Sequence, residues 1–280
     1  MKLLVTADLH YGTSRADNRQ VEALAQRVCQ EQADALLIAG DIGEGLPAIS
    51  ACLSLFRPFT GMKLAVPGNH DIWVHAGAAD SWDLHERALP QLFESHGFHP
   101  LHVRSTRIAD VGFVGSMGWY DYSFRDDIGI DLERYESKIY PGSPGPLWND
   151  ARYVRLPMSD VELTACLAQR LRDQLQSVDD CRSIVAVVHH LVSKRLLFHP
   201  RFMVPRVWRF LNAFLGSTVL GTVLTEQPRV RLALCGHIHR ARSVRQGRAC
   251  WSTVGRDHDA RELVYATPEA IVRRERFPAE

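Results

Sequence analysis

Several short, almost entirely apolar segments of this chain end abruptly at aspartate, asparagine or histidine. The segments are Lys2–Ala7, Ala35–Ala39, Met62–Val66, Ile184–Val188 and Val230–Leu234. Their length and aliphatic composition predict buried strands, because a strand covered on both faces carries few polar side chains. Helical periodicity at Asn18–Gln32 and a helical segment at about Pro47–Phe56 separate the first three strands. Such alternation predicts an α/β fold with a largely parallel sheet.

The pattern changes after the third strand. Ser81–His96 is predicted to be a helix interrupted at Pro90, and Val103–Ser116 to form two short strands. Trp119–Pro157 is rich in aromatic, charged, glycine and proline residues, which indicates a long irregular insertion. Long loops in compact domains are often functional, so this insertion is a candidate cover for a site. Its aromatic residues are expected to pack rather than to contact substrate.

Regular structure is expected to return at Ser159. Ser159 and Glu162 form a capping-box signature that opens an amphipathic helix to about Gln176. The remaining predicted elements are an irregular or helical segment at Arg195–Gly221, two strands around the turn Gln246-Gly247, and a strand at Leu263–Thr267. The chain is therefore expected to end with antiparallel strands.

Composition limits the class of protein. The 280 residues, of which 46% are hydrophobic and 23% charged, suit one large globular domain over residues 1–280. The net charge of +1 gives no general attraction to nucleic acid or to anionic lipid. The six cysteines are scattered without a C-x-x-C pair, and neither a signal peptide nor a membrane-spanning segment is visible. A reducing, cytoplasmic location is the expectation.

The polar residues at the strand ends form a candidate metal site. They are Asp8, His10, Asp41, Asn69, His189, His237 and His239. The carboxyl ends of parallel strands lie along one edge of a sheet, where open α/β sheets bind their ligands. The neighbouring glycines suit a chain that turns sharply and approaches an ion closely.

The donor types indicate which ions would bind. Imidazole and carboxylate without thiolate suit Mn, Fe, Zn, Ni or Co. Seven candidate ligands exceed the needs of one tetrahedral ion and fit two divalent ions that share a carboxylate. Two metals roughly 3.5–4 Å apart are the arrangement that enzymes use for in-line displacement at phosphorus.

These residues fall into five motifs in a fixed order. The motifs are Asp8-Leu9-His10, Gly40-Asp41, Gly68-Asn69-His70-Asp71, His189 after an apolar strand, and Gly236-His237-Ile238-His239. In this order and spacing the sequence resembles the calcineurin-like metallophosphoesterase family. The resemblance runs from residue 8 to residue 239 and leaves out the Trp119–Pro157 insertion.

The resemblance implies a fold and a role for each residue. The fold would be a two-sheet β-sandwich flanked by helices, in α/β/β/α layers, with a cap or lid insertion at about 119–157. One metal would be bound by Asp8, His10, Asp41 and His239, and the other by Asp41, Asn69, His189 and His237. The family pattern favours His189 over His190, because His189 directly follows the strand. His70 matches the catalytic histidine.

The expected reaction is hydrolysis of a phosphate ester. Two dications lower the pKa of a shared water and neutralise phosphate oxygens, and the hydroxide attacks phosphorus while His70 protonates the departing alkoxide. Asp71 is predicted to orient His70. A small phosphorylated or nucleotide-like substrate, as a phosphodiester or a phosphomonoester, is favoured over nucleic acid, since only short arginine clusters are present. The alternatives are a non-catalytic scaffold of the same fold and a nuclease.

Overall fold

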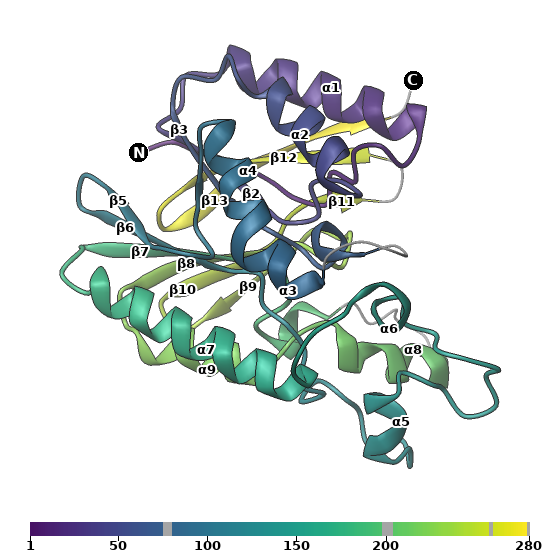
Figure 1. The fold of residues 1–280 in the computed structure, drawn as a ribbon. Coiled ribbons are helices and arrows are strands. Elements are labelled where there is room, and N and C mark those ends of the chain that lie inside the picture. Colours follow the sequence, from purple (N-terminus) through teal and green to yellow (C-terminus); the bar gives the residue numbers. More distant parts are fainter. Residues whose placement is uncertain (75–79, 198–203, 258–259, 279–280) are drawn as a thin grey trace.

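The computed structural model of the protein describes residues 1–74, 80–197, 204–257 and 260–278. Two mixed β-sheets face each other in the centre, and helices cover the outer face of each sheet (Figure 1). The predicted two-sheet sandwich flanked by helices is therefore confirmed. In the described residues no helix combines the length and the apolar character that crossing a bilayer requires.

The first sheet has seven strands in the described residues and begins the chain. Its strands are β1 (Leu3–Thr6), β2 (Ala35–Ala39), β3 (Met62–Val66), β4 (Phe98–Pro100), β11 (Arg256–Asp257), β12 (Ala260–Thr267) and β13 (Ala270–Pro278). The order is β11-β12-β1-β2-β3-β4, and β13 pairs with β12. Strands β1 to β4 are parallel, whereas β12 runs antiparallel to β1.

The second sheet has six strands in the same described residues. They are β5 (Thr106–Ile108), β6 (Val111–Ser116), β7 (Ser183–Val188), β8 (Val230–Cys235), β9 (Arg242–Gln246) and β10 (Ala249–Thr253), in the order β5-β6-β7-β8-β10-β9. The central strands β6, β7, β8 and β10 are parallel, and antiparallel strands close both edges.

Helices form the two outer layers. On the first sheet lie α1 (Arg15–Gln30), α2 (Leu46–Leu55) and α4 (Leu89–Ser95), and on the second lie α7 (Asp160–Ser177) and α9 (Thr218–Glu226) (Figure 1). The shorter helices are α3 (Ser81–Asp83), α5 (Leu132–Glu136), α6 (Asp150–Tyr153) and α8 (Arg206–Leu211), with single turns at His70–Ile72, Lys194–Leu196 and Asn212–Phe214. The capping box that was predicted for Ser159 and Glu162 opens α7.

Side chains alternate between the two faces of each strand, so each strand contributes to two layers of the core. On β1, Leu3 and Val5 face the second sheet, whereas Leu4 faces the helices. On β7, Val185 and Val187 face the first sheet in the same way. Both faces of these strands are therefore buried, which explains why their sequences are almost entirely apolar.

The strand ends that carry the predicted site belong to two sheets rather than one. Strands β1, β2 and β3 lie in the first sheet, whereas β7 and β8 lie in the second. The loops after them nevertheless meet, because the His237 amide of the second sheet donates to Asp8 Oδ1 of the first at 2.9 Å, and His189 Nδ1 lies 2.8 Å from the Ala39 carbonyl. The prediction of a single sheet edge was wrong, but the ends do converge.

The predicted insertion forms a compact aromatic body beside this edge. Trp119, Tyr120, Tyr122 and Phe124 are buried, and Phe210 of α8 stacks on Tyr135 of the insertion. In Figure 1, α5, α6 and α8 lie together at the lower right, away from the outer helices α1 and α2. The expectation that the aromatic residues pack is confirmed.

Other predicted elements differ from the structure. The helix runs from Ser81 to Ser95, and its α-helical regularity is broken by a π-helical turn at Leu84–Ala88 shortly before Pro90, which lies in the first turn of α4. Strand β4 was not predicted, since it is only three residues long and ends in proline. Strand β13 was also missed, because it carries four consecutive charged residues, 273–276, instead of an apolar run.

Candidate metal centre

Four of the predicted ligands form one group between the sheets. Asp8, His10, Asp41 and His239 each offer a ligand atom, and these atoms lie within 4.8 Å of one another. The Nε2 atoms of His10 and His239 are 3.0 Å apart. His10 Nε2 lies 3.6 Å from Asp41 Oδ2, and His239 Nε2 lies 3.9 Å from Asp8 Oδ1. This group could hold one ion.

The remaining three predicted ligands form a second group on the other side of Asp41. Asn69 Oδ1 lies 3.2 Å from His189 Nε2 and 3.1 Å from His237 Nδ1. The two histidine nitrogens are 3.3 Å apart, and His189 Nε2 is 3.4 Å from Asp41 Oδ1. Since Asp41 contributes one carboxylate oxygen to each group, it lies where a shared ligand would lie.

The donor set fits cations. Asp8 Oδ2 is buried without a hydrogen-bond partner, and burial raises the pKa of Asp8 to about 7. The Oδ2 atom of this buried carboxylate therefore has no hydrogen-bond donor, and a cation would supply the partner that a buried anion requires. The donors are oxygen and nitrogen, with no cysteine, which suits divalent transition metals.

Asp41 and His189 form an ion pair in the centre of the site. Burial by itself would raise the pKa of Asp41, but the nearby His189 and His70 hold it well below its usual range. Burial would lower the pKa of His189, yet the charges of Asp41 and Asp8 raise it to about 9. In the metal-free protein His189 thus carries a proton that a metal ion would have to displace.

The backbone is strained at the predicted ligands. Positive φ angles are rare in residues other than glycine. Eight such residues occur in the described chain, and five are predicted ligands: Asp8 (51°), His10 (44°), Asp41 (53°), His237 (73°) and His239 (52°). Strain of this kind persists where surrounding contacts enforce it, and it concentrates at functional sites.

Two motif glycines let the loops approach the side chains of Asp41 and His189 closely. A Cβ atom on Gly68 would lie 2.1 Å from Asp41 Oδ1. Gly40 has a φ of +87°, and a Cβ atom there would lie 2.4 Å from His189 Nδ1. A third glycine, Gly255, was not singled out from the sequence; its Cβ atom would lie 2.1 Å from Asp8 Oδ2.

His189 and His190 have different surroundings. The Nε2 atom of His189 points to Asn69 and Asp41, whereas Nδ1 of His190 lies 3.2 Å from the Met117 carbonyl. The ring of His190 packs against His237 at a centroid distance of 4.2 Å, and its Nε2 is buried without a partner. His189, His190 and His237 each offer a ligand atom within 4.8 Å of one another, so the choice of His189 over His190 stays a prediction.

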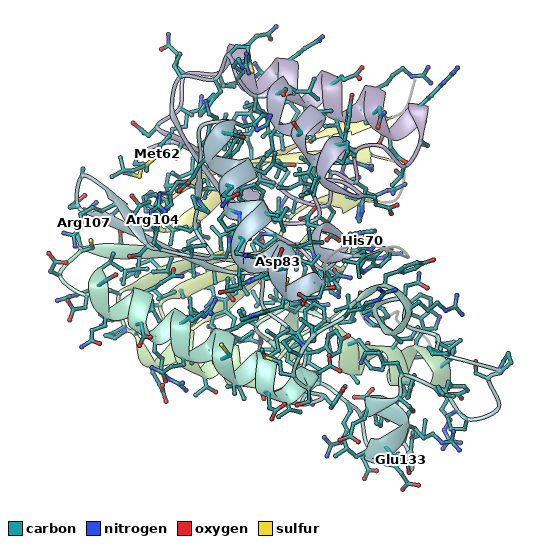
Figure 2. All side chains as sticks on the ribbon, viewed as in Figure 1. Met62, His70, Asp83, Arg104, Arg107 and Glu133 are labelled. Atoms are coloured by element: carbon teal, nitrogen blue, oxygen red, sulfur yellow. The ribbon has the colours of Figure 1, made fainter. Side chains whose placement is uncertain are left out.

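His70 lies beside both groups. Its amide donates to Asp41 Oδ1 at 3.0 Å, and its ring lies 4.6 Å from that of His10. The ring stacks on Trp73 at 3.6 Å, and Nδ1 lies 3.5 Å from Glu44 Oε1. Figure 2 places His70 near the insertion but far from Glu133, which lies at the outer end of that insertion. The His70 side chain is 24% exposed, so a substrate can reach it.

Asp71 has partners other than the one predicted. Its carboxylate accepts hydrogen bonds from the amides of Ile42 and Gly43 at 2.8 and 3.1 Å and of Gly68 at 2.8 Å. These bonds join the loops after β2 and β3, and Glu44 is the carboxylate that faces the His70 ring. Asp71 therefore fixes the loops, and its predicted action on His70 would be indirect.

Asp150, in the insertion, was not predicted although it contacts three parts of the site. Its carboxylate accepts from Asn69 Nδ2 at 2.9 Å, from Trp73 Nε1 at 2.8 Å and from Trp148 Nε1 at 2.7 Å. Because the Asn69 amide group donates to Asp150, its Oδ1 atom is turned toward His189 and His237. No sequence signal marked Asp150, since it lies outside every motif, in a segment that was predicted to be irregular.

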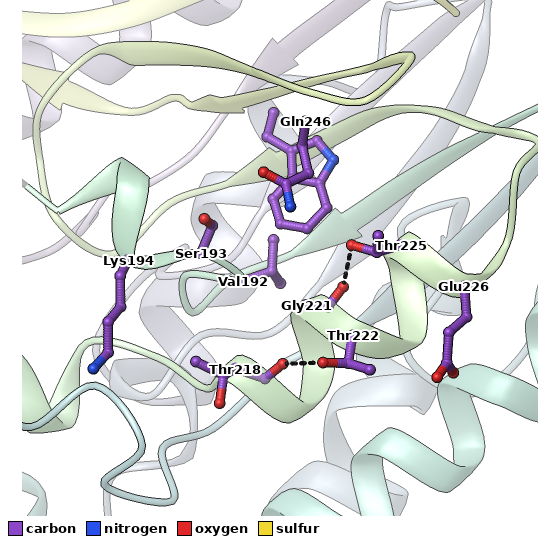
Figure 3. A pocket seen from close by; sticks show the side chains of 10 residues that line it. Val192, Ser193, Lys194, Thr218, Gly221, Thr222, Thr225, Glu226 and Gln246 are labelled. Atoms are coloured by element: carbon purple, nitrogen blue, oxygen red, sulfur yellow. Dashed lines mark hydrogen bonds between the residues drawn. The ribbon is translucent and has the colours of Figure 1, made fainter.

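Of two hollows in the structure, one is lined by predicted metal ligands and the other is not. One, of about 350 Å³, is lined by His237 and His239 together with Trp148 and Trp208. The other, of about 430 Å³, lies along α9 and is lined by Val192, Gly221 and Gln246 (Figure 3). None of the predicted site residues lines this second hollow, so only the first adjoins the candidate metal centre.

Comparison with known proteins identifies the family. Residues 1–241 match the family described as calcineurin-like phosphoesterase. The chain belongs to this family. A search of curated proteins found no match to this calcineurin-like phosphoesterase.

Solved structures share its fold at low sequence identity. A phosphopantetheinyl hydrolase from Mycobacterium tuberculosis is 18% identical with a TM-score of 0.70, over 92% of this chain and 90% of that one. A dimetal phosphatase from Danio rerio is 14% identical with a TM-score of 0.55, over 100% and 99% of the two chains. GAP50, the anchor in the inner membrane complex of Plasmodium, is 10% identical with a TM-score of 0.52, over 100% and 89%. These likenesses show the calcineurin-like phosphoesterase fold alone.

Proposed function

We propose that this protein hydrolyses a phosphate ester of a small molecule with the help of two divalent transition metals. The observation that carries the proposal is the pair of ligand groups that share Asp41 beside His70. Asp8, His10, Asp41 and His239 would hold one ion, and Asp41, Asn69, His189 and His237 the other. When bound, two such ions supply charge that neutralises phosphate oxygens and makes a water acidic enough to attack near neutral pH.

His70 would protonate the leaving group. The oxygen of water forms a bond to phosphorus while the ester P–O bond breaks, and the departing alkoxide takes a proton from His70, which regains one from solvent. Glu44 faces Nδ1 of His70, and stacking on Trp73 fixes the plane of the ring. If Nδ1 carries one proton toward Glu44 and Nε2 a second one toward the substrate, donation from Nε2 to the leaving group leaves a neutral ring with its proton on Nδ1. Glu44 and Trp73 are therefore positioning residues.

The substrate class and the location are part of the proposal. A net charge of +1 offers no extended basic surface for nucleic acid, so a small phosphorylated molecule is favoured. All six cysteines are free thiols, which agrees with a reducing, cytoplasmic compartment. Residues of the 119–157 insertion would act as a cap beside the metal centre.

Metal reconstitution tests the proposal. The protein would be stripped with a chelator and reloaded separately with Mn, Fe, Zn, Ni or Co. Turnover of phosphomonoesters, phosphodiesters and dinucleoside polyphosphates would then be measured together with metal content. We expect activity to vanish on stripping and to return with about two ions per chain. Activity that survives complete stripping would contradict the proposed mechanism, and failure to bind any metal would favour a non-catalytic scaffold.

A further inference from the structure

The hollow of about 350 Å³ opens directly beside the candidate metal centre. His237 and His239 form one wall, and they belong to the second and the first ligand group respectively. A phosphate held between the two groups would therefore direct a substituent into this hollow. Its volume lies in the range of small-molecule pockets and exceeds what a phosphoryl group needs.

Most of the remaining wall is apolar. It includes Trp148, Pro205, Trp208, Leu215 and Ile238. A polyphosphate chain or a sugar–phosphate backbone makes no favourable contact with such a wall. An apolar group is stabilised there, because binding removes it from water. The organic part of the ester thus matches the hollow better than further phosphate groups do.

Trp208 is the residue of this wall that best indicates which chemical group the hollow binds. Its side chain is 61% exposed, and in the described ranges it is the only aromatic residue among the exposed large hydrophobics. Trp148, which lines the same hollow, is fixed, because its Nε1 donates to Asp150 at 2.7 Å and its ring stacks on Phe214 at a centroid distance of 5.5 Å. An exposed indole beside a fixed indole offers a stacking surface for a flat ring.

The charge of the wall restricts the ligand further. Arg240 lines the hollow, and none of the described lining residues is acidic. Two aromatic rings could otherwise attract a quaternary ammonium group through cation–π contacts. A guanidinium group in the same wall disfavours a cationic substituent and tolerates a neutral or anionic one.

These observations concern the same site as the proposed phosphoesterase activity and rest on it. We infer that the hollow lined by Trp148, Trp208 and Arg240 binds the organic group of the ester, and that this group is a flat, neutral or anionic ring stacked on Trp208. The substrate class is then an aryl or nucleobase-bearing phosphate ester, and phosphocholine-like esters are excluded.

Binding of non-hydrolysable phosphonates to the metal-loaded protein tests this inference. Benzylphosphonate carries a flat ring, and cyclohexylmethylphosphonate carries a saturated ring of similar size. The third probe, 2-(trimethylammonio)ethylphosphonate, carries a cationic group, and methylphosphonate carries only a methyl group. Calorimetry should give the tightest binding for benzylphosphonate, on the order of tenfold tighter than methylphosphonate, as loss of one stacking contact predicts. The cationic probe should bind no better than methylphosphonate.

Substitutions of Trp208 test whether its exposed indole is the group that binds the ring. Trp208→Ala should weaken benzylphosphonate on the order of tenfold and leave methylphosphonate and metal content unchanged, while Trp208→Phe should restore most of the affinity. Val161→Ala, which removes an exposed side chain of α7 outside the hollow, is the matched control. Equal affinity for the flat and the saturated ring, tightest binding of the cation, or no effect of Trp208→Ala would overturn the inference.

This assay separates two kinds of failure, because it measures binding without turnover. If benzylphosphonate binds through Trp208 but no ester is hydrolysed, the proposed function fails and the ring-binding hollow stands. If esters are hydrolysed but Trp208→Ala changes neither the Kd of benzylphosphonate nor the KM of aryl esters, the hollow fails and the function stands.

Discussion

The two ligand groups of the candidate metal centre are supported in different ways. The first group, with Asp8 and His10, is held by loops that directly follow strands: the His10 amide donates to the Asp41 carbonyl at 2.9 Å, and the His237 amide to Asp8 Oδ1 at 2.9 Å. The second group depends also on the insertion, because Asp150 orients Asn69 and Trp148 packs edge-on against His237 at 5.7 Å.

Because of this difference, we expect substrate binding to be coupled more strongly to the ion in the second ligand group than to the ion in the first. Trp148 and Asp150 are neighbours in the insertion, and Trp148 forms a wall of the hollow while Asp150 fixes Asn69. We therefore expect the second ion to respond to changes in the insertion, and the first to be insensitive to them.

The largest effect is expected at the residue that both groups share. Asp41→Ala removes a carboxylate oxygen from each group, so both ions and more than about 10⁴-fold of the activity should be lost together. Metal analysis and turnover on the same sample check this. Retention of one tightly bound ion would show that Asp41 serves only one group.

His70→Ala should separate chemistry from metal binding. We expect two ions per chain to remain while kcat falls by about 10² to 10⁴-fold, most for esters with poor leaving groups, since the proton donor is lost. Glu44→Gln should produce a smaller loss of the same kind. If His70→Ala instead emptied the site, its assignment as a non-ligand would be wrong.

Asp150→Asn is the sharpest test of the difference between the groups. It keeps the shape of the side chain but lets an amide face Asn69, so the affinity of the second ion should fall about 10 to 100-fold while the first is retained. Calorimetric titration of the metal-free protein resolves the two sites. As a matched control, Asp131→Asn changes an exposed carboxylate elsewhere in the insertion and should leave both affinities unchanged.

The smallest effect is a pH dependence of the metal-free protein. The folded-state pKa of His189, about 9, lies above its ordinary value of 6.5 because Asp41 and Asp8 favour the charged form against the cost of burial. Its contribution to stability is then complete below pH 6.5 and is lost as the pH rises through 9. Tm should fall over this range without metal. Metal affinity should rise, since proton displacement from His189 becomes easier; a metal affinity independent of pH would contradict the ion pair.

The sequence was sufficient to predict that the polar strand ends would meet, although not that they belong to two sheets. Each buried strand is marked by an uninterrupted apolar run, and Asp8, Asp41, His189 and the others follow such runs directly, so position in the chain predicts position in space. The division into two sheets did not follow from these runs, because a strand buried on both faces has the same composition in either sheet.

The supporting residues could not be predicted in the same way. Asp150 and Glu44 lie outside regular strands, where no periodicity relates sequence spacing to direction in space. Asp150 contacts Asn69 across 81 positions of chain, and only the packing of the aromatic insertion brings the two together. The roles of such residues depend on tertiary contacts, which local pattern does not encode.

The positive φ angles at five predicted ligands have a consequence for the evolution of this protein. A glycine at Asp8 or His239 would relieve the backbone, so part of the stability of the chain is given up to hold side chains that serve the centre. Descendants that no longer need catalysis can become more robust simply by losing these residues. The presence of all five ligands in so unfavourable a conformation is therefore what the proposed function predicts.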